Sequence, residues 1–478
     1  ILAMFKTALY VTMAALALSI STALALDEIP DAVKKITGKY KIPDSSISLM
    51  VQDVDSFSPR LSLNAQVPRN PASSIKLLTT FVALDVLGPT YTWPTKLYAL
   101  GPIKDGVLDG DLVLKGYGDP YLVVEEFWKM LGELHALGVE SINGDLVIDN
   151  SHFDVPDLDP GAFDQQPDHL YNVVPNAVLI NFKALEFQFS PVGDGKNIHI
   201  RARPPLPNLK ITNQLSVTQA ACRDYQIGIK MNVPDRVNAD HVIFSGAFPS
   251  ACRSYSLHRS ALQPASYAFG LFQILWKHWG GSIVGGFREG RVPPKQRPIL
   301  VSQSPPLAEI IRAVNKWSNN VMTRLLLYSL ATTKYDPPVT KQQGIEVLRE
   351  YLRQNELDDA DLVIDNGSGL SRETRITGEL MNGLLRHAYR DPYMAEFIAS
   401  MSINGMDGTT RERFRGRPEK GHMHLKTGRL DDVAAIAGYV HAASGRTYTV
   451  VLLINHNNVH KGSGIEIQDA LLKWVHGR

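Results

Sequence analysis

Residues 71–84, PASSIKLLTTFVAL, constrain this chain more than any other stretch. Pro71 stands just ahead of a serine pair, and apolar residues then recur at positions 77, 78, 81, 82 and 84. This pattern predicts a helix that begins at the serines and is buried within the protein. Gly88 and Pro89 follow and end the predicted helix.

Two residues at the start of this helix, Ser73 and Lys76, are a candidate nucleophile and base. They stand three positions apart, so their side chains share one face of the helix. A hydroxyl at a helix N-terminus lies where the dipole and free N–H groups favour negative charge, and a desolvated lysine amine can accept a proton near neutral pH. A helix-capping serine with a solvated lysine is the non-catalytic alternative for the same spacing.

Two later motifs support the catalytic interpretation. The triplet Ser-Asn-Asn occupies positions 318–320, and the triplet Lys-Thr-Gly occupies positions 426–428. The order Ser-x-x-Lys, Ser-x-Asn, Lys-Thr-Gly is a signature of penicillin-binding proteins and class A β-lactamases. Three elements in this order are specific, whereas Ser-x-x-Lys alone is common.

The composition fits a large globular protein without a nucleic-acid partner. The 478 residues are enough for two or three domains with a large core. Hydrophobic residues make up 44% and charged residues 20%, and 49 basic side chains are balanced by 48 acidic ones. Because there is no basic excess to neutralise phosphates, we set nucleic-acid binding aside.

The N-terminus has the pattern of a cleaved targeting segment. Lys6 supplies a short positive start, residues 7–20 are apolar, and Ala-Leu-Ala at 23–25 matches a small-x-small cleavage site. We therefore predict a signal peptide at residues 1–25 and a soluble exported protein. A membrane anchor is the weaker alternative, because the apolar run is short.

Cys222 and Cys252 are the two cysteines of the chain. In an oxidising exported compartment we expect them to form one disulfide. A catalytic cysteine is the alternative, but neither residue stands at a helix start or in a convincing histidine neighbourhood.

Strand and helix patterns divide the mature chain into a discontinuous domain and an insertion. Residues 46–51 alternate as a strand, and residues 61–64 are its expected hairpin partner. Short strands separated by Gly, Pro, Asn and Asp fill residues 89–261, with one helix near 125–137. This β-rich region has room for two nested subdomains.

Helical periodicity then returns, followed by late strands and a closing helix. The expected helices are 267–279, 306–316, 321–330, 345–354, 377–389 and 465–475, and the expected late strands are 433–440, 448–454 and one through Lys426. Early and late strands together predict a sheet assembled from both chain ends. The predicted peptidase domain is 26–88 with 262–478, and the predicted insertion is 89–261.

This arrangement resembles the class C low-molecular-mass penicillin-binding proteins, the D-alanyl-D-alanine carboxypeptidase/endopeptidases of the penicillin-binding protein 4 family. The resemblance covers nearly the whole mature chain. The supporting stretches are GYGDP at 116–120, NGD at 143–145, DNGSGLSR at 365–372 and NGMDGT at 404–409. The long interval between Ser73 and Ser318 also fits, because the class C proteins carry an inserted β-rich region there. The fold implied is α+β and multidomain, with a β-lactamase/transpeptidase-like α/β domain, its antiparallel sheet and the β-rich insertion.

The resemblance implies catalysis through an acyl-enzyme. Ser73 attacks the carbonyl of the penultimate D-alanine, Lys76 takes the serine proton, and Ser318 relays a proton to the leaving amine. The N–H groups of Ser73 and Arg429 form the oxyanion hole. The middle residue of the second motif is Asn319, where Asp is common in the family, but that side chain has no direct chemical role.

The resemblance also implies a set of substrate-binding residues. Asn320 binds the substrate amide, and Lys426 and Thr427 hold the terminal carboxylate. Gly428 and Arg429 follow them in the same motif and also belong to the substrate-binding residues. Arg372 contacts a substrate carboxylate, and Asp168 binds the free amine of a diaminopimelate side chain. A structural role in a turn is the alternative for Arg372.

The implied enzyme is periplasmic and acts on peptidoglycan peptides that end in D-Ala-D-Ala and on D-Ala cross-links, and β-lactam antibiotics inhibit it covalently. No cofactor or metal is implied, because the histidine pairs at 422/424 and 456/460 lack convergent ligands. A β-lactamase on the same fold is one alternative, although no Glu-x-x-x-Asn segment lies between the second and third motifs. A non-catalytic cell-wall scaffold is the other. The sequence leaves open the carboxypeptidase or endopeptidase preference and the oligomeric state, a homodimer included.

Overall fold

The structure, a computed structural model, describes residues 28–193, 197–222 and 228–478. The predicted signal peptide at 1–25 lies outside the described residues. Within them, no helix is both long enough and apolar enough to cross a membrane. The chain divides into two compact units: the first contains residues up to 78, 356–365 and 372–478, and the second contains residues 79–355 and 366–371.

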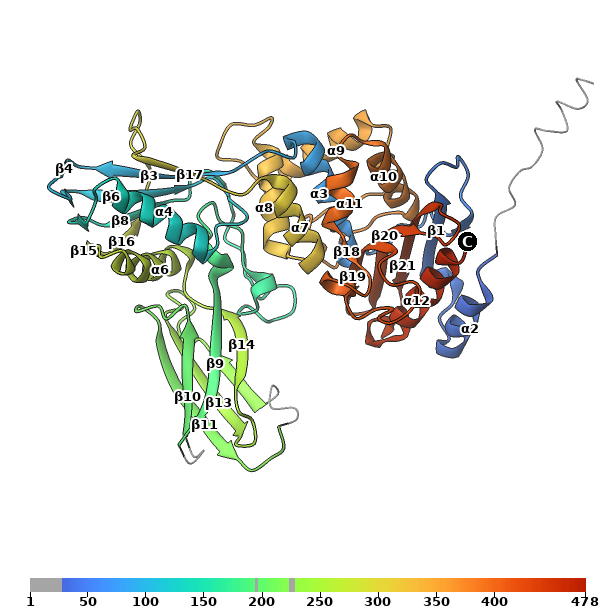
Figure 1. Cartoon of the computed structure of the whole chain (residues 1–478), viewed down its shortest axis with the longest axis horizontal. Helices are drawn as coiled ribbons and strands as arrows, with labels where there is room; N and C mark the ends of the chain where they lie inside the picture. The colour runs from blue at the N-terminus through green and yellow to red at the C-terminus, as the bar shows by residue number, and fades with distance from the viewer. Residues whose placement is uncertain (1–27, 194–196, 223–227) are drawn as a thin grey trace, which may run out of the picture. The chain divides into compact units, whose positions relative to one another are not determined.

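The first unit is built on one six-stranded antiparallel sheet in the order β18-β19-β20-β21-β1-β2. Its elements are α2 (Asp31–Tyr40), η1 (Asp44–Ser46), β1 (Ile47–Asp53), β2 (Leu61–Leu63), η2 (Ala72–Ile75), α10 (Gly378–Arg390), α11 (Met394–Ser400), β18 (Ser402–Ile403), η5 (Gly408–Thr410), β19 (Met423–Leu430), β20 (Val433–His441), β21 (Thr447–Asn455), η6 (Val459–Lys461) and α12 (Ser463–His476). Strands from the two ends of the chain meet where β1 pairs with β21, as the sequence predicts (Figure 1).

The alternation of β1 gives this sheet two different faces. Leu49 and Val51 point into a hydrophobic core shared with α2 and α12. On the other face, Asn382 of α10 donates to the side-chain oxygen of Gln52 (2.7 Å), and Thr449 of β21 donates to Asn382 (2.6 Å). The first unit is therefore a three-layer structure with helices on both faces of the sheet.

Helix α3 (Lys76–Leu87) is the buried helix that the sequence predicts. Every side chain from Leu77 to Leu84 is fully buried. Two of these residues are polar, and each has a partner: Thr79 donates to the carbonyl of Gly367 (2.8 Å), and Thr80 accepts from Asn315 (3.0 Å). Because its buried polar groups are satisfied, α3 can run through the interior without loss of stability.

Among the described residues, the second unit contains four sheets, most of α3 and five further helices. Its helical elements are α4 (Val124–Ala136), η3 (Leu170–Asn172), η4 (Ile180–Lys183), α6 (Pro264–His278), α7 (Leu307–Trp317), α8 (Asn320–Ala331) and α9 (Lys341–Gln354). Its strands are β3 (Pro94–Leu100), β4 (Ile103–Lys104), β5 (Val107–Leu108), β6 (Asp111–Gly116), β7 (Ser141–Ile142), β8 (Leu146–Asp149), β9 (Ala184–Val192), β10 (Asn197–Arg203), β11 (Lys210–Thr218), β12 (Ile229–Asn232), β13 (His241–Pro249), β14 (Tyr255–Ser260), β15 (Ser282–Ile283), β16 (Phe287–Glu289) and β17 (Leu300–Gln303).

The inserted region continues beyond its predicted end at residue 261. The largest sheet of the second unit has the order β16-β8-β6-β3-β17, so its two edge strands come from residues 287–303. Helix α6 packs with α4 in the same hydrophobic core. The sequence places the boundary too early because helical periodicity returns at α6 before the sheet is complete.

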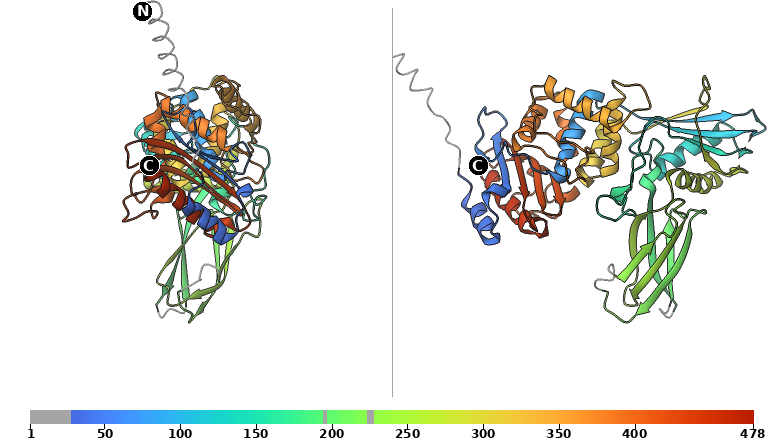
Figure 2. Two further views of the ribbon diagram at one scale, coloured as in Figure 1. Left: turned by 90° about the vertical axis from the view of Figure 1, so that its right-hand side faces the viewer. Right: turned by 180° about the vertical axis from the view of Figure 1, so that it is seen from behind.

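The six strands β9 to β14 form a separate sandwich within this region (Figure 2). One sheet has the order β10-β9-β14 and the other β11-β13-β12. The ring of Phe244 meets Phe187 and Phe189 edge to face, with centroids 4.8 and 5.0 Å apart. Cys222 and Cys252 form a disulfide in this sandwich.

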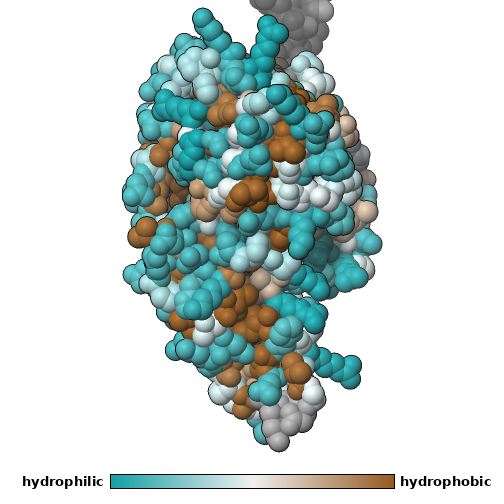
Figure 3. Space-filling model, turned by 90° about the vertical axis from the view of Figure 1, so that its left-hand side faces the viewer, coloured by the Kyte–Doolittle hydropathy of each residue, from teal (hydrophilic) through white to brown (hydrophobic). Residues whose placement is uncertain are grey.

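The exposed apolar residues of the second unit are scattered rather than gathered on one broad face. Val237 is 78% exposed and Val284 is 77% exposed, and they lie far apart in the sequence. Figure 3 shows hydrophilic residues over most of one face, with smaller hydrophobic patches between them. Single exposed apolar residues are normal on a protein surface and indicate no interaction site.

We predict that Phe244→Ala destabilises the sandwich by about 3–5 kcal/mol, because it removes a fully buried ring and leaves a cavity between the two sheets. Hydrogen exchange of the β9 amides measures this loss. Val237→Ala, at an exposed position, is the control and should change the exchange little. Equal exchange in both variants would contradict the assignment of Phe244 to the core.

Candidate active site

Ser73 lies in a strained turn. Residues 72–75 form the 3-10 turn η2, and α3 begins directly after it at Lys76. Ala72 has φ 44, in the left-handed region that residues other than glycine rarely adopt. Its N–H donates to Oδ1 of Asn70 (2.9 Å), so a neighbouring side chain holds the strained residue. Backbone strain of this kind clusters at functional sites.

Asparagines tie this turn to the sheet of the first unit. The N–H of Asn70 donates to Oδ1 of Asn455 on β21 (2.8 Å), and Nδ2 of Asn455 donates back to the carbonyl of Asn70 (3.0 Å). Within the turn, the hydroxyl of Ser74 donates to the carbonyl of Pro71 (2.8 Å). The sequence motifs gave no signal for Asn70 or Asn455, because their pairing spans almost the whole chain.

The amine of Lys76 lies against the hydroxyl of Ser73. Its Nζ donates to Ser73 Oγ at 2.9 Å, and the Lys76 side chain is fully buried. This is the distance expected between a nucleophile and its base. A proton can therefore pass directly between the two groups.

A second buried lysine, Lys426, lies on β19. It is fully buried, and burial lowers the pKa of its ammonium to about 7. Its Nζ donates to the carbonyl of Thr427 (2.8 Å). The hydroxyl of Thr427 donates to the hydroxyl of Thr409 (2.9 Å), which belongs to the stretch 404–409 singled out in the sequence. A lysine and a hydroxyl thus lie side by side on one strand.

Strand β19 passes very close to the turn that carries Ser73. A Cβ atom at Gly428 would lie 2.4 Å from the carbonyl oxygen of Pro71 and 3.1 Å from the N of Ser73, so only glycine fits there. Strand β18 pairs with β19 only at His424 and Leu425. The segment from Lys426 onward is therefore an edge to which an extended peptide can add.

Residues 318–320 form a tight connection between two helices of the second unit. Ser318 follows α7 with φ 58 and ψ 41, again in the left-handed region. Asn319 caps α8, and its side chain accepts from the N–H of Met322 (3.0 Å). Because aspartate caps a helix as well as asparagine does, Asn319 in place of Asp preserves this local structure.

Asn320 is the first residue of α8 and is 8% exposed. Its Nδ2 donates to the carbonyl of Tyr171 (3.4 Å). The hydroxyl of Tyr171 donates in turn to the carboxylate of Asp164 (2.7 Å), which also accepts from Asn172 (2.8 Å). Asp164 is thus linked to Asn320 through one residue, and sequence analysis did not single it out.

Asp168 lies elsewhere on the same loop. Its two carboxylate oxygens accept from the guanidinium of Arg236 at 2.5 and 3.1 Å. The two side chains line a cavity of the second unit. The carboxylate of Asp168 is therefore already neutralised by a bidentate partner.

Arg372 lines a cavity of about 360 Å³ in the first unit, next to the end of β19. Its guanidinium lies 3.7 Å from the carboxylate of Asp431, and both side chains are exposed. Arg375 and Asn70 line the same cavity. An exposed arginine in a hollow can exchange such a partner for a substrate carboxylate at little cost. Arg429, one residue after Gly428, is exposed on β19.

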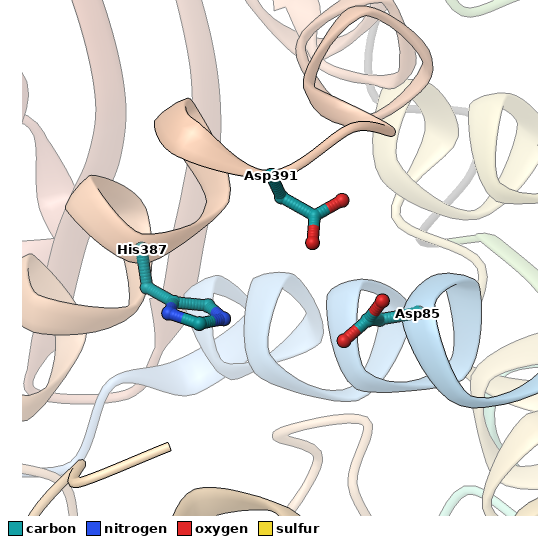
Figure 4. A group of neighbouring side chains, drawn as sticks. All are labelled: Asp85, His387 and Asp391. Carbon is teal, nitrogen blue, oxygen red and sulfur yellow. The ribbon is translucent and has the colours of Figure 1, made fainter.

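Figure 4 shows three side chains that could each offer a ligand atom to a metal ion. Asp85 lies on α3 in the second unit, where its carboxylate accepts from the hydroxyl of Tyr351 (2.6 Å). His387 lies on α10 in the first unit, and Asp391 follows the same helix. Among the described residues neither unit contributes three ligands by itself, so we assign no metal site.

A family model and a relative of known activity both match this chain over most of its length. Residues 30–477 match the model of the D-Ala-D-Ala carboxypeptidase 3 (S13) family. The chain is 29% identical over 421 residues to a D-alanyl-D-alanine carboxypeptidase of Actinomadura sp. (strain R39), which covers 84% of this chain and 76% of that protein.

Solved structures share the fold. Penicillin-binding protein 4 from Haemophilus influenzae superposes with a TM-score of 0.80 at 22% identity, covering 93% of this chain and 99% of that one. A predatory endopeptidase of Bdellovibrio bacteriovorus, acylated by penicillin G, superposes with a TM-score of 0.51 at 15% identity, covering 90% of each chain.

We predict that Gly428→Ala destabilises the protein by about 1–3 kcal/mol, because the added methyl group overlaps the carbonyl of Pro71. Urea unfolding measures the change. Gly38→Ala is the matched control, since a Cβ at this position in α2 meets nothing within 4 Å and alanine favours a helix. If the two variants were equally stable, the close approach of β19 to the turn would be refuted.

Proposed function

Because the chain belongs to the D-Ala-D-Ala carboxypeptidase 3 (S13) family, and is therefore a serine-type D-alanyl-D-alanine carboxypeptidase, we propose that Ser73 is its nucleophile. The observation that carries this proposal is the 2.9 Å contact between Lys76 Nζ and Ser73 Oγ. Ser73 attacks the carbonyl of the penultimate D-alanine. The terminal D-alanine leaves, and water hydrolyses the resulting ester.

Lys76 acts as the base in this scheme. Its amine takes the proton of Ser73 as the C–O bond forms, which requires a neutral amine within hydrogen-bond reach. The full burial of Lys76 and its contact with Ser73 Oγ support that role, because the amine lies within direct reach of the hydroxyl proton. Ser318, in the second unit, relays a proton to the leaving amine.

The oxyanion hole consists of the N–H groups of Ser73 and Arg429. The close approach of Gly428 to the turn supports this arrangement, because it brings the β19 backbone beside the N of Ser73. Two preorganised donors stabilise the charge that develops on the carbonyl oxygen, each by roughly 3 kcal/mol. A glycine at 428 is therefore needed both for packing and for catalysis.

The edge of β19 binds the C-terminal end of the substrate. Lys426 supplies a positive charge and Thr427 a hydroxyl for the terminal carboxylate, while Asn320 binds the substrate amide. An extended peptide can pair with the open edge after Leu425. The same groups hold the carboxylate of a β-lactam, whose carbonyl then acylates Ser73.

Arg372 and an acidic residue recognise the side chain of the stem peptide. Arg372 binds a side-chain carboxylate from its cavity beside β19. For the free amine, the expected residue is Asp168, which would have to release Arg236. Asp164 is the second candidate, because its link through Tyr171 to Asn320 needs no such exchange. The natural substrates are peptidoglycan peptides and D-Ala cross-links, and the enzyme is exported to the periplasm through a signal peptide at residues 1–25.

We predict that Ser73→Ala abolishes D-alanine release from an N-acetylated peptide ending in D-Ala-D-Ala, a loss of about a thousandfold or more. Chromatography of the released D-alanine measures the rate. Ser74→Ala is the matched control, because its hydroxyl donates to the backbone of the same turn and makes no contact with Lys76 in the described structure. Continued turnover by Ser73→Ala, or loss confined to Ser74→Ala, would assign the nucleophile elsewhere.

We also predict a pH dependence that arises from Lys426. Because burial lowers its pKa to about 7, Lys426 is charged below this pH and becomes neutral above it. The KM for peptides with a free C-terminal carboxylate should therefore rise by about tenfold per pH unit above 7, until binding no longer depends on the charge.

The Lys426→Gln variant should lose this pH dependence and show a high KM throughout. Lys420→Gln, at an exposed position of the first unit, should keep the dependence of the parent protein. Rates at saturating substrate are measured at each pH, so that changes in kcat are separated from changes in KM. A KM of the parent protein that does not change between pH 6 and 9 would contradict the role of Lys426.

A further inference from the structure

A cavity of about 930 Å³ lies within the second unit, and Asp168 is the one residue of its lining to which the scheme above gives a substrate-binding role. The loop 155–176, the turn at Lys183, the segment 236–239 and residues 260–264 line it, together with Glu289. A volume of this size is enough for a small molecule or a peptide of a few residues. The wall combines apolar residues and prolines with charged side chains of both signs, including Lys183, Arg236 and Asp168.

Lys183 enters this cavity from an unusual piece of backbone. Asn181, Phe182 and Lys183 have φ values of 50, 54 and 54, so three successive residues other than glycine are left-handed. This region is unfavourable for any residue that carries a side chain. Such strain persists only where the surroundings impose it, and it is concentrated at functional positions.

Buried groups on both sides hold the turn in this conformation. The side chain of Asn181 donates to the carbonyl of Ala184 (3.3 Å) and to the hydroxyl of Tyr267 (3.1 Å), which is fully buried. Phe182 packs against the hydrophobic cluster that contains Phe153. With these two side chains anchored, the next one, Lys183, is directed to the cavity wall.

The ammonium of Lys183 makes no hydrogen bond or ion pair with any residue that the structure describes. Burial lowers its pKa to about 8, while the nearby charge of Asp168 opposes that shift. Asp168 itself is occupied by the bidentate contact with Arg236. A partly buried cation that its surroundings leave uncompensated is a binding group for an anion.

Three exposed side chains of the lining carry the opposite charge to Lys183. Asp157, Asp159 and Glu289 line the cavity and are exposed, and we refer to these three residues as the acidic rim. A ligand with a negative group inside and a positive group outside matches this distribution. A fatty acid matches it less well, because it brings no cation to the rim.

We propose that this cavity is a second ligand site, which binds a short peptide with its free carboxylate on Lys183 and a free amine at the acidic rim. The choice of a peptide rests on the proposed function, because an enzyme that cuts peptides with free C-terminal carboxylates is surrounded by substrates and products of this kind. The carboxylate accepts hydrogen bonds from the ammonium, and the apolar walls contact the short side chains.

The test uses the full mature protein, first acylated with benzylpenicillin to fill the active site. Mass spectrometry of the Ser73 peptide shows whether that step succeeds, so failure of the proposed function is visible before the cavity is probed. Reductive methylation then labels lysines in the absence and presence of L-Lys-D-Ala-D-Ala, and peptide mapping reports the labelling rate of Lys183 alone.

We expect the tripeptide to slow the methylation of Lys183 by about tenfold, as one charge-assisted contact permits. Its C-terminal amide should give no protection, and its diacetylated form should protect less than the parent. Lys183→Gln should weaken binding, measured by calorimetry, by about tenfold or more. Lys230→Gln, an exposed lysine of the same unit, is the control and should bind as the parent does.

Equal protection by the tripeptide and its amide would overturn the proposal, and so would the absence of any protection. Protection by dodecanoate but not by the tripeptide would assign the cavity to a lipid and would also overturn it. The labelling experiment uses the parent protein and no variant. It therefore tests the proposal even if Lys183→Gln fails to fold.

Discussion

The contact between Gly428 and the turn that carries Ser73 is the constraint on which the site depends. A strand and a strained turn approach so closely that a single methyl group would not fit between them. Ser73, the proposed nucleophile, lies in the same compact unit as the buried Lys76 and as Lys426, the proposed carboxylate-binding residue. The strain at Ala72 is sustained because Asn70 and Asn455 tie the turn to the central sheet.

Two buried lysines serve different purposes in this account. Lys76 contacts the hydroxyl of Ser73 and is the proposed base, whereas Lys426 lies on β19 and is the proposed partner of a substrate carboxylate. Burial matters for both proposed roles, because the protonation of an amine that is removed from water depends strongly on the groups around it. In the second unit, Ser318 and Asn320 lie at a helix junction, where a left-handed residue and a helix cap fix the local backbone.

The periodicity of apolar residues predicts most of the helices and strands, because these elements are buried on at least one side. The strands β1, β20 and β21 and the helices α3, α8 and α12 carry apolar patterns that only a packed interior explains. The end of the insertion was placed too early, because β16 and β17 are short and exposed and complete a sheet that began far earlier in the chain. The helices α2 and α11 were not predicted.

Contacts between side chains that lie far apart in the sequence could not be predicted from the sequence. Spacing alone placed Ser73 and Lys76 on one helix face, but it could not show that Arg236 occupies Asp168 or that Asp164 reaches Tyr171. It also could not show the left-handed turn at residues 181–183, since no glycine marks it. Local sequence patterns predict local backbone geometry, whereas contacts between distant residues depend on the whole fold.

The most direct test of the central claim is time-resolved mass spectrometry of the mature protein after brief exposure to benzylpenicillin. If Ser73 is the nucleophile, a lasting adduct forms on the peptide that contains this residue. An adduct that forms and disappears rapidly, with hydrolysis of the drug, would indicate a β-lactamase instead. An adduct on another residue, or none at all, would contradict the assignment of Ser73 as the nucleophile.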